Sequence, residues 1–122
     1  MSALERPLIC RILDGLETHN CFTMTEYMAS DHSGLIAPRE SWKGLEEGRI
    51  TRDGDFPFNA LGGLIELGYP VETTGVRLAL DCPRQVTRQA GKYPFANAEN
   101  LITFDVAGSA ATCASFVVGA GS

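Results

Sequence analysis

The 122-residue chain has the length and composition of one small globular domain. Its net charge is −5 without a basic run, which argues against nucleic acid or an anionic membrane as a partner. No apolar stretch has the length of a membrane span, and the polar start of the chain lacks the apolar core of a signal peptide. We therefore expect a cytoplasmic protein.

The cysteines and histidines do not predict a metal site. The two histidines are His19 and His32, and the four cysteines, none in a Cys-x-x-Cys pair, are Cys10, Cys21, Cys82 and Cys113. This spacing is not that of a zinc site. We expect no metal, and we interpret most of the cysteines as small buried hydrophobic residues in a reducing compartment.

The chain begins with two short segments, of which the second is predicted to be a strand. Residues 8–13 are an apolar run that is consistent with a buried strand or with the start of a helix. Residues 16–22 alternate loosely, which predicts a strand that ends near Asn20.

Two helices are predicted next. Thr23 and Glu26 have the spacing of a capping box, so a helix should begin at Thr23 and end within residues 30–34. Its inward side chains are expected to be Met24, Tyr27 and Met28. A second helix is predicted over residues 38–48, because a proline begins this segment and a glycine ends it. Its apolar side should hold Trp42 and Leu45.

Residues 59–75 form the segment around which the chain is organised. The backbone of this segment is set by Gly62, Gly63, Gly68, Pro70 and Gly75. The apolar run at 64–67 is about one or two helical turns long. We expect a loop–helix–loop unit with Asn59 and Tyr69 at its two bends. A packed turn whose glycines serve folding only is the alternative.

The last third of the chain predicts a helix followed by a β-hairpin. Residues 76–89 read as a helix that Pro83 should kink or interrupt. Its expected buried side chains are Val76, Leu80 and Val86. After a loop over 91–98, two antiparallel strands are predicted at 101–106 and 112–118. The class is α/β, a layered mixed sheet with helices that ends in a hairpin.

The spacing of the central segment resembles a signature of the thiolase family. Asn59, Gly62-Gly63, the triplet 68–70 and Gly75 are in register with Asn-x-x-Gly-Gly followed by Gly-His-Pro-x-x-x-x-Gly. Residues 16–23 also resemble the Glu-x-His-Asp-x-Phe segment of the sterol-carrier-type thiolases. The resemblance covers most of the chain and implies one thiolase-like C-terminal domain over residues 1–122. The N-terminal half, which bears the nucleophilic cysteine of a thiolase, has no counterpart.

The resemblance also implies the positions of an acyl-CoA site. Tyr69 takes the place of the Gly-His-Pro histidine, His19 that of a water-holding Asn or His, and Asp105 or a neighbour that of the acid/base cysteine. We expect these three to be catalytic, although a structural histidine and a structural tyrosine stay open from the residues alone. The residues expected to bind substrate are Asn20, Asn59, Gly62 and Gly63. Coenzyme A thioester would enter as substrate, with no bound cofactor.

The substitution of tyrosine for histidine changes the expected chemistry. A phenol donates a hydrogen bond at neutral pH but seldom accepts a proton. This property suits stabilisation of an alkoxide or enolate better than it suits thiolysis. We do not expect Cys82 or Cys113 to be a nucleophile. Cys113 falls inside the last strand, where we expect burial to raise the pKa of its thiol and leave it inert.

Two functional hypotheses follow. The first is one chain of a heteromeric acyl-CoA enzyme that makes or breaks a carbon–carbon bond, by thiolysis or Claisen condensation or by retro-aldol cleavage. A complementary thiolase-like chain, or an acyl-CoA-binding partner protein, would complete its pocket. The second is a non-catalytic acyl-CoA-binding or assembly module, and a piece of a longer enzyme is a third possibility. A domain without its other half should expose apolar surface and associate.

Overall fold

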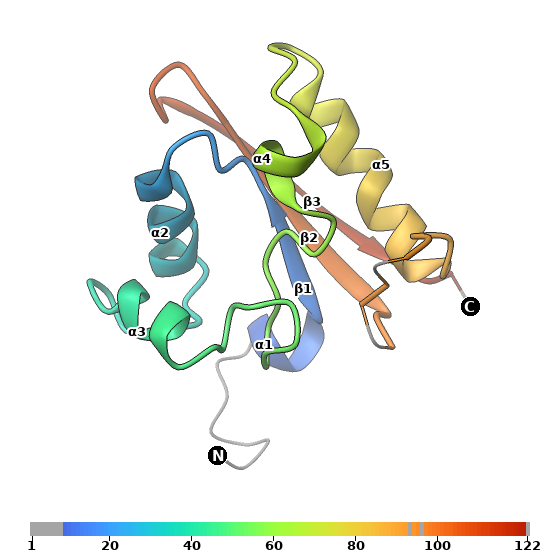
Figure 1. Cartoon of the computed structure of the whole chain (residues 1–122), viewed down its shortest axis with the longest axis horizontal. Coiled ribbons are helices and arrows are strands. Elements are labelled where there is room, and N and C mark those ends of the chain that lie inside the picture. The colour runs from blue at the N-terminus through green and yellow to red at the C-terminus, as the bar shows by residue number, and fades with distance from the viewer. Residues whose placement is uncertain (1–8, 93, 96, 122) are drawn as a thin grey trace.

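The computed structural model describes residues 9–92, 94–95 and 97–121, and the findings below concern these residues. Figure 1 shows a small sheet with helices on both sides. In chain order the elements are α1 (Ile9–Ile12), β1 (Gly15–Thr18), α2 (Thr23–His32), α3 (Ser41–Glu46), α4 (Gly63–Leu67), α5 (Thr74–Val86), β2 (Asn100–Ala107) and β3 (Thr112–Gly119). The apolar run near the N-terminus therefore holds a short helix, one of its two predicted alternatives.

The sheet is mixed, with the strand order β1-β2-β3. β1 runs parallel to β2, and β2 pairs antiparallel with β3 over its whole length, from Asn100 opposite Gly119 to Ala107 opposite Thr112. Phe58 adds a parallel bridge to Leu16. The predicted α/β class and the terminal hairpin are confirmed, as is the short helix between the two bends of the central segment.

A hydrophobic cluster lies on each face of the sheet. Leu16 and Phe56 belong to the cluster on the side of α2, where Ile102 and Phe104 pack against it. Leu101 and Cys82 belong to the cluster on the side of α5, and both are completely buried. Since neighbouring residues of a strand point to opposite faces, β2 sends Leu101 to one cluster and Ile102 to the other.

Helix α2 begins where it was predicted, but its cap differs from the prediction. The backbone N–H of Phe22 donates to Thr25 Oγ1 at 3.2 Å. Glu26 does not close a capping box, because its Oε2 accepts a hydrogen bond of 3.1 Å from Asn20 Nδ2. The expected burial of the two methionines is also wrong: Met24 and Met28 are 65% and 42% exposed. The buried residues of α2 are the small Ala29 and Ser30.

Helices α3 and α5 also turn a different face inward from the one predicted. α3 is shorter than predicted and buries Ser41 and Gly44, whereas the side chains expected inside, Trp42 and Leu45, are about half exposed. A Cβ atom on Gly44 would overlap Ile36, so the glycine allows the close contact. On α5 the buried residues include Leu78, Cys82 and, as predicted, Val86, but not Val76 or Leu80. The helix continues past Pro83 without interruption.

Candidate functional site

The ends of β1 and β2 bring a histidine and a carboxylate together. Because the two strands are parallel, His19 follows β1 at the level of Asp105 in β2, and its N–H donates to Phe104 O at 3.0 Å. His19 Nδ1 lies 3.0 Å from Asp105 Oδ1, and the histidine is only 6% exposed. A carboxylate oxygen can only accept a hydrogen bond, so in the neutral imidazole this contact places the proton on Nδ1 and the lone pair on Nε2.

Tyr69 contacts the same imidazole from another direction. It lies in the loop between α4 and α5, where the glycine and proline on either side of it shape the turn. The ring centroids of His19 and Tyr69 are 5.1 Å apart, with an interplanar angle of 87°, an edge-to-face contact. Tyr69 is 50% exposed. The structure thus brings together all three residues that the sequence proposed as catalytic.

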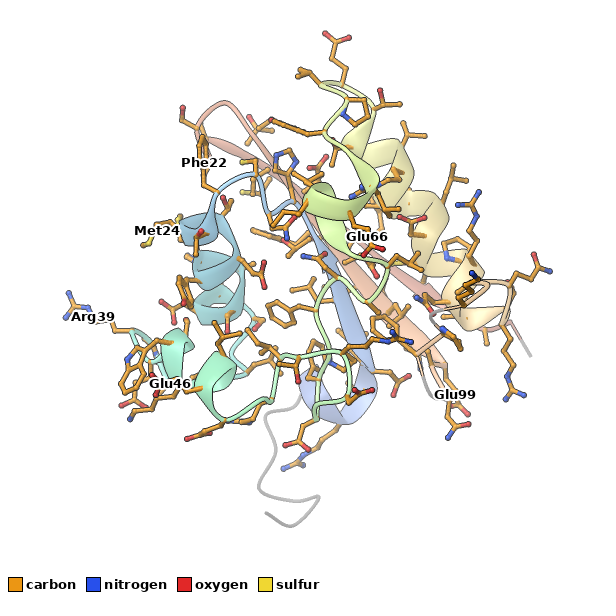
Figure 2. The ribbon with its side chains drawn as sticks, viewed as in Figure 1. Phe22, Met24, Arg39, Glu46, Glu66 and Glu99 are labelled. Carbon is orange, nitrogen blue, oxygen red and sulfur yellow. The ribbon has the colours of Figure 1, made fainter. Side chains whose placement is uncertain are left out.

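These aromatic side chains open onto a pocket of about 540 Å³, a size typical of small-molecule sites. Its walls are the start of α2 and the β2–β3 turn, and its lining residues are His19, Cys21, Phe22, Met24, Thr25, Met28, Tyr69 and residues 106–110. Figure 2 shows Phe22 near that turn and Met24 projecting outward from α2. Phe22 was not predicted as a site residue, and Met24 and Met28 were predicted to face inward.

The position of Asp105 depends on the start of α5. Its Oδ2 atom lies so close to Gly75 that a Cβ atom there would overlap it. Its Oδ1 atom accepts a hydrogen bond of 3.0 Å from the N–H of Val106 in addition to the contact with His19. The carboxylate is thereby held between the imidazole and the first turn of α5, whose N-terminal end favours negative charge.

None of the four residues expected to bind substrate is among the described residues that line this pocket. Asn59, at φ +48°, accepts the N–H of Thr18 at 2.7 Å through Oδ1. Asn20 Oδ1 accepts the N–H of Leu64 at 3.0 Å. Gly63 packs against that amide, since a Cβ atom on it would lie 2.7 Å from Asn20 Nδ2. These contacts join β1 to the central segment, and Gly62 precedes α4 in a left-handed conformation at φ +102°.

A buried group of polar residues lies between β1 and α5 and was not predicted. Glu17 is 1% exposed, and burial, reinforced by the nearby Asp81, raises its pKa to about 8 against the opposing effect of Arg77. Burial also raises the pKa of Asp81. Arg77 Nε lies 3.5 Å from Asp81 Oδ2, and its Nη1 donates to Gly63 O at 3.1 Å. The i, i+4 spacing of Arg77 and Asp81 is the one sequence signal that pointed to this group.

The three cysteines with described side chains differ in environment. Burial raises the pKa of Cys82 to about 12, which keeps it a thiol. Cys113 is exposed, so the expectation that the last strand buries it is wrong; β3 is an edge strand with an uncovered surface. Cys21 is partly buried and lines the pocket. The side chain of Cys10 lies outside the described residues.

Neither a metal site nor a membrane-spanning helix is present in the described part of the chain. Within it, no three His, Cys, Asp or Glu side chains are grouped so as to hold a metal ion. No helix there combines the length and the apolar character needed to cross a membrane.

Comparison with known proteins gives one family and several relatives. The sequence model of the family described as "Thiolase C-terminal domain-like" matches residues 10–120. An acetyl-CoA acetyltransferase of Methanothermobacter thermautotrophicus is 32% identical over 102 residues, which are 84% of this chain and 27% of the relative. Bovine sterol carrier protein 2 is 31% identical over 80 residues, 66% of this chain and 15% of the relative. Benzoylsuccinyl-CoA thiolase subunit BbsB of Thauera aromatica is 27% identical over 78 residues, 64% of this chain and 20% of the relative.

Proposed function

The chain belongs to the thiolase C-terminal domain-like family, and from this premise we propose that it supplies acid–base groups to an acyl-CoA site where a carbon–carbon bond is made or broken. The observation that carries the proposal is the contact of one buried imidazole, His19, with both Asp105 and Tyr69 at the edge of a pocket. Two of the relatives are named for reactions of CoA thioesters, which supports the substrate class.

The three residues fit the proton transfers of such a reaction. When the Nδ1–H of His19 donates its hydrogen bond to the Asp105 carboxylate, Nε2 is the atom that accepts a proton. The carboxylate then stabilises the imidazolium that forms. In the retro-aldol direction, His19 would take the proton of a β-hydroxyl group. The bond between the α and β carbons then breaks, a carbonyl product leaves, and the electron pair passes to the thioester as an enolate. The Tyr69 hydroxyl would donate a hydrogen bond to the enolate oxygen, and the His19 imidazolium would return its proton to the α carbon of the enolate.

Thiolysis would need a further group. Its attacking thiol belongs to coenzyme A, and a second thiol must carry the acyl group. The resemblance implies that Asp105 or a neighbour takes the position of the acid/base cysteine of a thiolase. The product test is direct: thiolysis consumes free CoA and yields two acyl-CoA molecules, whereas retro-aldol cleavage releases a carbonyl compound without consuming CoA.

We propose further that a complementary thiolase-like chain or segment completes the pocket. The chain spans about a quarter or less of the length of the curated relatives that it matches, and one of these relatives is named as a subunit. The stretch from α4 into α5 also presents apolar side chains to solvent, with Ile65 92% and Val71 72% exposed. A surface of this kind suits an apolar protein interface.

The proposal is tested by Tyr69→Phe and His19→Ala in the assembled enzyme, with Tyr27→Phe as the matched control on α2, outside the residues that line the pocket. Each of the first two variants should reduce turnover by about 10²-fold or more, because each removes a group that moves or stabilises a proton. The temperature of thermal unfolding should stay close to that of the unmodified chain while turnover falls. Full turnover in both variants would instead support the non-catalytic binding or assembly module.

A further inference from the structure

The turn that carries Tyr69 is held by a side chain of α5. Figure 1 shows α4 beside the first turns of α5. There, Arg77 Nη1 donates to the carbonyl oxygen of Gly63 at 3.1 Å and to that of Gly68 at 3.4 Å. The first carbonyl belongs to the residue that begins α4, and the second belongs to the residue directly before Tyr69. Each Nη atom of a guanidinium carries two N–H groups, so one nitrogen can serve both acceptors.

The guanidinium of Arg77 is fixed from its other side by a carboxylate. Arg77 Nε lies 3.5 Å from Asp81 Oδ2, one turn further along α5, and the two side chains are only 16% and 3% exposed. Water therefore competes little for this ion pair, which restricts the orientation of the planar guanidinium. Arg77 thus links the body of α5 to both ends of α4.

The segment that Arg77 holds has few means of fixing its own shape. Gly63 and Gly68 have φ values of +59° and +86°, a region that glycine enters and leaves with little cost. α4 has only five residues, too few for a helix that is stable by itself. Tyr69 is half exposed, and its edge-to-face contact with His19 is a weak interaction. Contacts from another element must therefore set the direction of the phenol.

We propose that Arg77 is a positioning residue for Tyr69, which it directs toward His19 through the carbonyls at the two ends of α4. The inference rests on the proposed function for its effect on turnover. A second contact from α5 supports it, since the buried Thr74 donates its hydroxyl to Pro70 O at 3.3 Å. The carbonyls on both sides of Tyr69 are therefore held by side chains of one helix.

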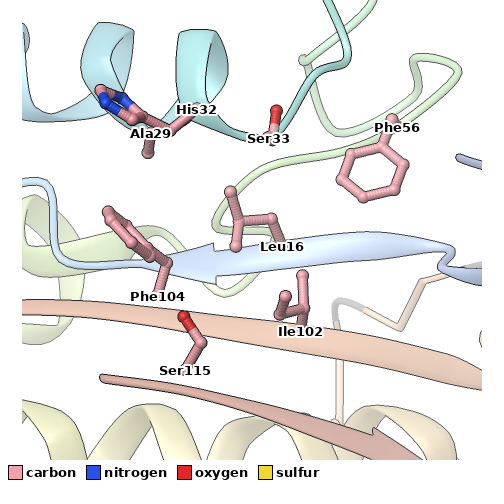
Figure 3. Close-up of a pocket in the computed structure, with 8 residues that line it drawn as sticks. All are labelled: Leu16, Ala29, His32, Ser33, Phe56, Ile102, Phe104 and Ser115. Carbon is pink, nitrogen blue, oxygen red and sulfur yellow. The ribbon is translucent and has the colours of Figure 1, made fainter. Parts of the chain in front are cut away.

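The position of the phenol can be measured by NMR on the full chain, which has two histidines. The ring of Tyr69 lies 5.1 Å from that of His19, so its ring current shifts the His19 signals, and Tyr69→Ala gives the value without that ring. His32 is the internal reference. It lines a different cavity, of about 180 Å³ between α2 and the sheet (Figure 3), which has no described lining residue in common with the pocket beside Tyr69.

Arg77→Met keeps an unbranched side chain but has no N–H group to donate. It should move the His19 signals at least halfway to the Tyr69→Ala value and leave those of His32 unchanged. Arg84→Met is the matched control, because Arg84 contacts the same carboxylate, that of Asp81, from the last turn of α5. Unmoved His19 signals in Arg77→Met, or an equal movement in Arg84→Met, would overturn the positioning role.

Two further measurements cover the case in which Arg77→Met does not fold, since it leaves the buried Asp81 with fewer partners. Arg77→Met combined with Asp81→Asn removes both charges of the pair and should move the His19 signals in the same way. In the unmodified chain, the Nη protons of Arg77 should give separate, slowly exchanging signals, because their hydrogen bonds restrict rotation of the guanidinium. A single averaged signal would overturn the proposal without any variant.

Turnover of the assembled enzyme tests whether Arg77 acts through the phenol. Arg77→Met should reduce kcat by about tenfold or more, with a smaller change in KM, because a displaced hydroxyl stabilises the transition state less well. Arg77→Met combined with Tyr69→Phe should be no slower than Tyr69→Phe alone, since the two changes remove the same contribution. Additive losses would mean that Arg77 acts by another route.

The NMR and turnover results together separate this inference from the proposed function. If the His19 signals move as expected but neither Arg77→Met nor Tyr69→Phe slows turnover, the proposed function fails and the positioning role stands. If Tyr69→Phe slows turnover but Arg77→Met changes neither the His19 signals nor kcat, the positioning role is wrong and the proposed function stands.

Discussion

Glu17 shows what burial does to a single titratable residue. It lies inside β1, and one of its carboxyl oxygens, Oε1, has no hydrogen-bond partner among the described residues. Removing water disfavours the charged form of an acid, and Asp81 nearby adds like charge. With its pKa at about 8, the side chain is mostly neutral at pH 7. The fold therefore avoids burying an uncompensated charge beneath His19.

This state predicts how stability depends on pH. The pKa of Glu17 is about 8 in the folded chain against 4.5 for the ordinary group, so the folded state holds a proton that the unfolded state has lost. The stabilisation is complete below about pH 4.5 and is lost as the pH rises through 8. Between these values the free energy of unfolding should fall by about 1 kcal/mol per pH unit. Urea unfolding at several pH values measures this slope.

Glu17→Gln should remove most of the slope. A smaller dependence of the same sign should remain, because burial also raises the pKa of Asp81. Glu47→Gln, at the exposed end of α3, should leave the slope unchanged. An undiminished slope in Glu17→Gln would mean that this carboxyl group is already ionised in the folded chain.

Helix α5 acts on the site as a whole element. Its buried side chains attach it to the sheet, and its first turn lies against the carboxylate that orients His19. The glycine in that turn, Gly75, does not have the left-handed backbone conformation of Gly62 or Gly63. What Gly75 provides is space for Asp105 rather than freedom of the backbone.

Gly75→Ala separates these two roles. Alanine favours a helix over glycine by about 1 kcal/mol, so the free energy of unfolding should change by no more than about that amount. The added Cβ atom would displace the Asp105 carboxylate, and turnover of the assembled enzyme should fall by at least about tenfold. The NMR signal of the His19 Nδ1 proton should shift. Gly121→Ala is the control, because a Cβ atom there would meet open space. Unchanged turnover together with an unchanged proton signal in Gly75→Ala would contradict the role of Gly75.

At the scale of the whole molecule, the distribution of apolar side chains is uneven. Both faces of the sheet have a core, yet the stretch of the chain from α4 to α5 exposes several large apolar side chains, as α2, α3 and β3 also do. Those of the stretch from α4 to α5 are Ile65, Leu67, Tyr69, Val71, Val76 and Leu80. Val76 and Leu80 are spaced i, i+4 and share one side of α5. Exposed apolar side chains that share one side of a helix mark a candidate interaction surface.

The isolated chain should therefore associate through this surface. Sedimentation at increasing protein concentration should show self-association, and the double variant Val76→Lys with Leu80→Lys should reduce it. The free energy of unfolding should change by less than about 1 kcal/mol, because both side chains are more than half exposed. Thr87→Lys, just past the end of α5, is the control. A monomer at every concentration would contradict the interface.

The sequence by itself determined the features that depend on local spacing. The glycine and proline pattern of 59–75 predicted α4 and its two bends, alternation predicted the hairpin, and motif order led to the family. The same motifs led to His19, Tyr69 and Asp105. The parallel ends of β1 and β2 bring His19 to Asp105, and the loop between α4 and α5 brings Tyr69 to His19. Glycine and proline restrict the backbone wherever they occur, so their effect can be predicted without knowing the neighbours.

Only the tertiary structure decided which apolar side chains are buried. Met24, Trp42 and Leu80 were predicted to face inward but are exposed, while the small Ala29 and Gly44 make the close contacts. Hydrophobic character states that burial would be favourable, but it does not state which neighbour is near enough to provide it. The buried Glu17 and the pocket beside His19 likewise depend on segments that are distant in the sequence and meet only when the chain folds.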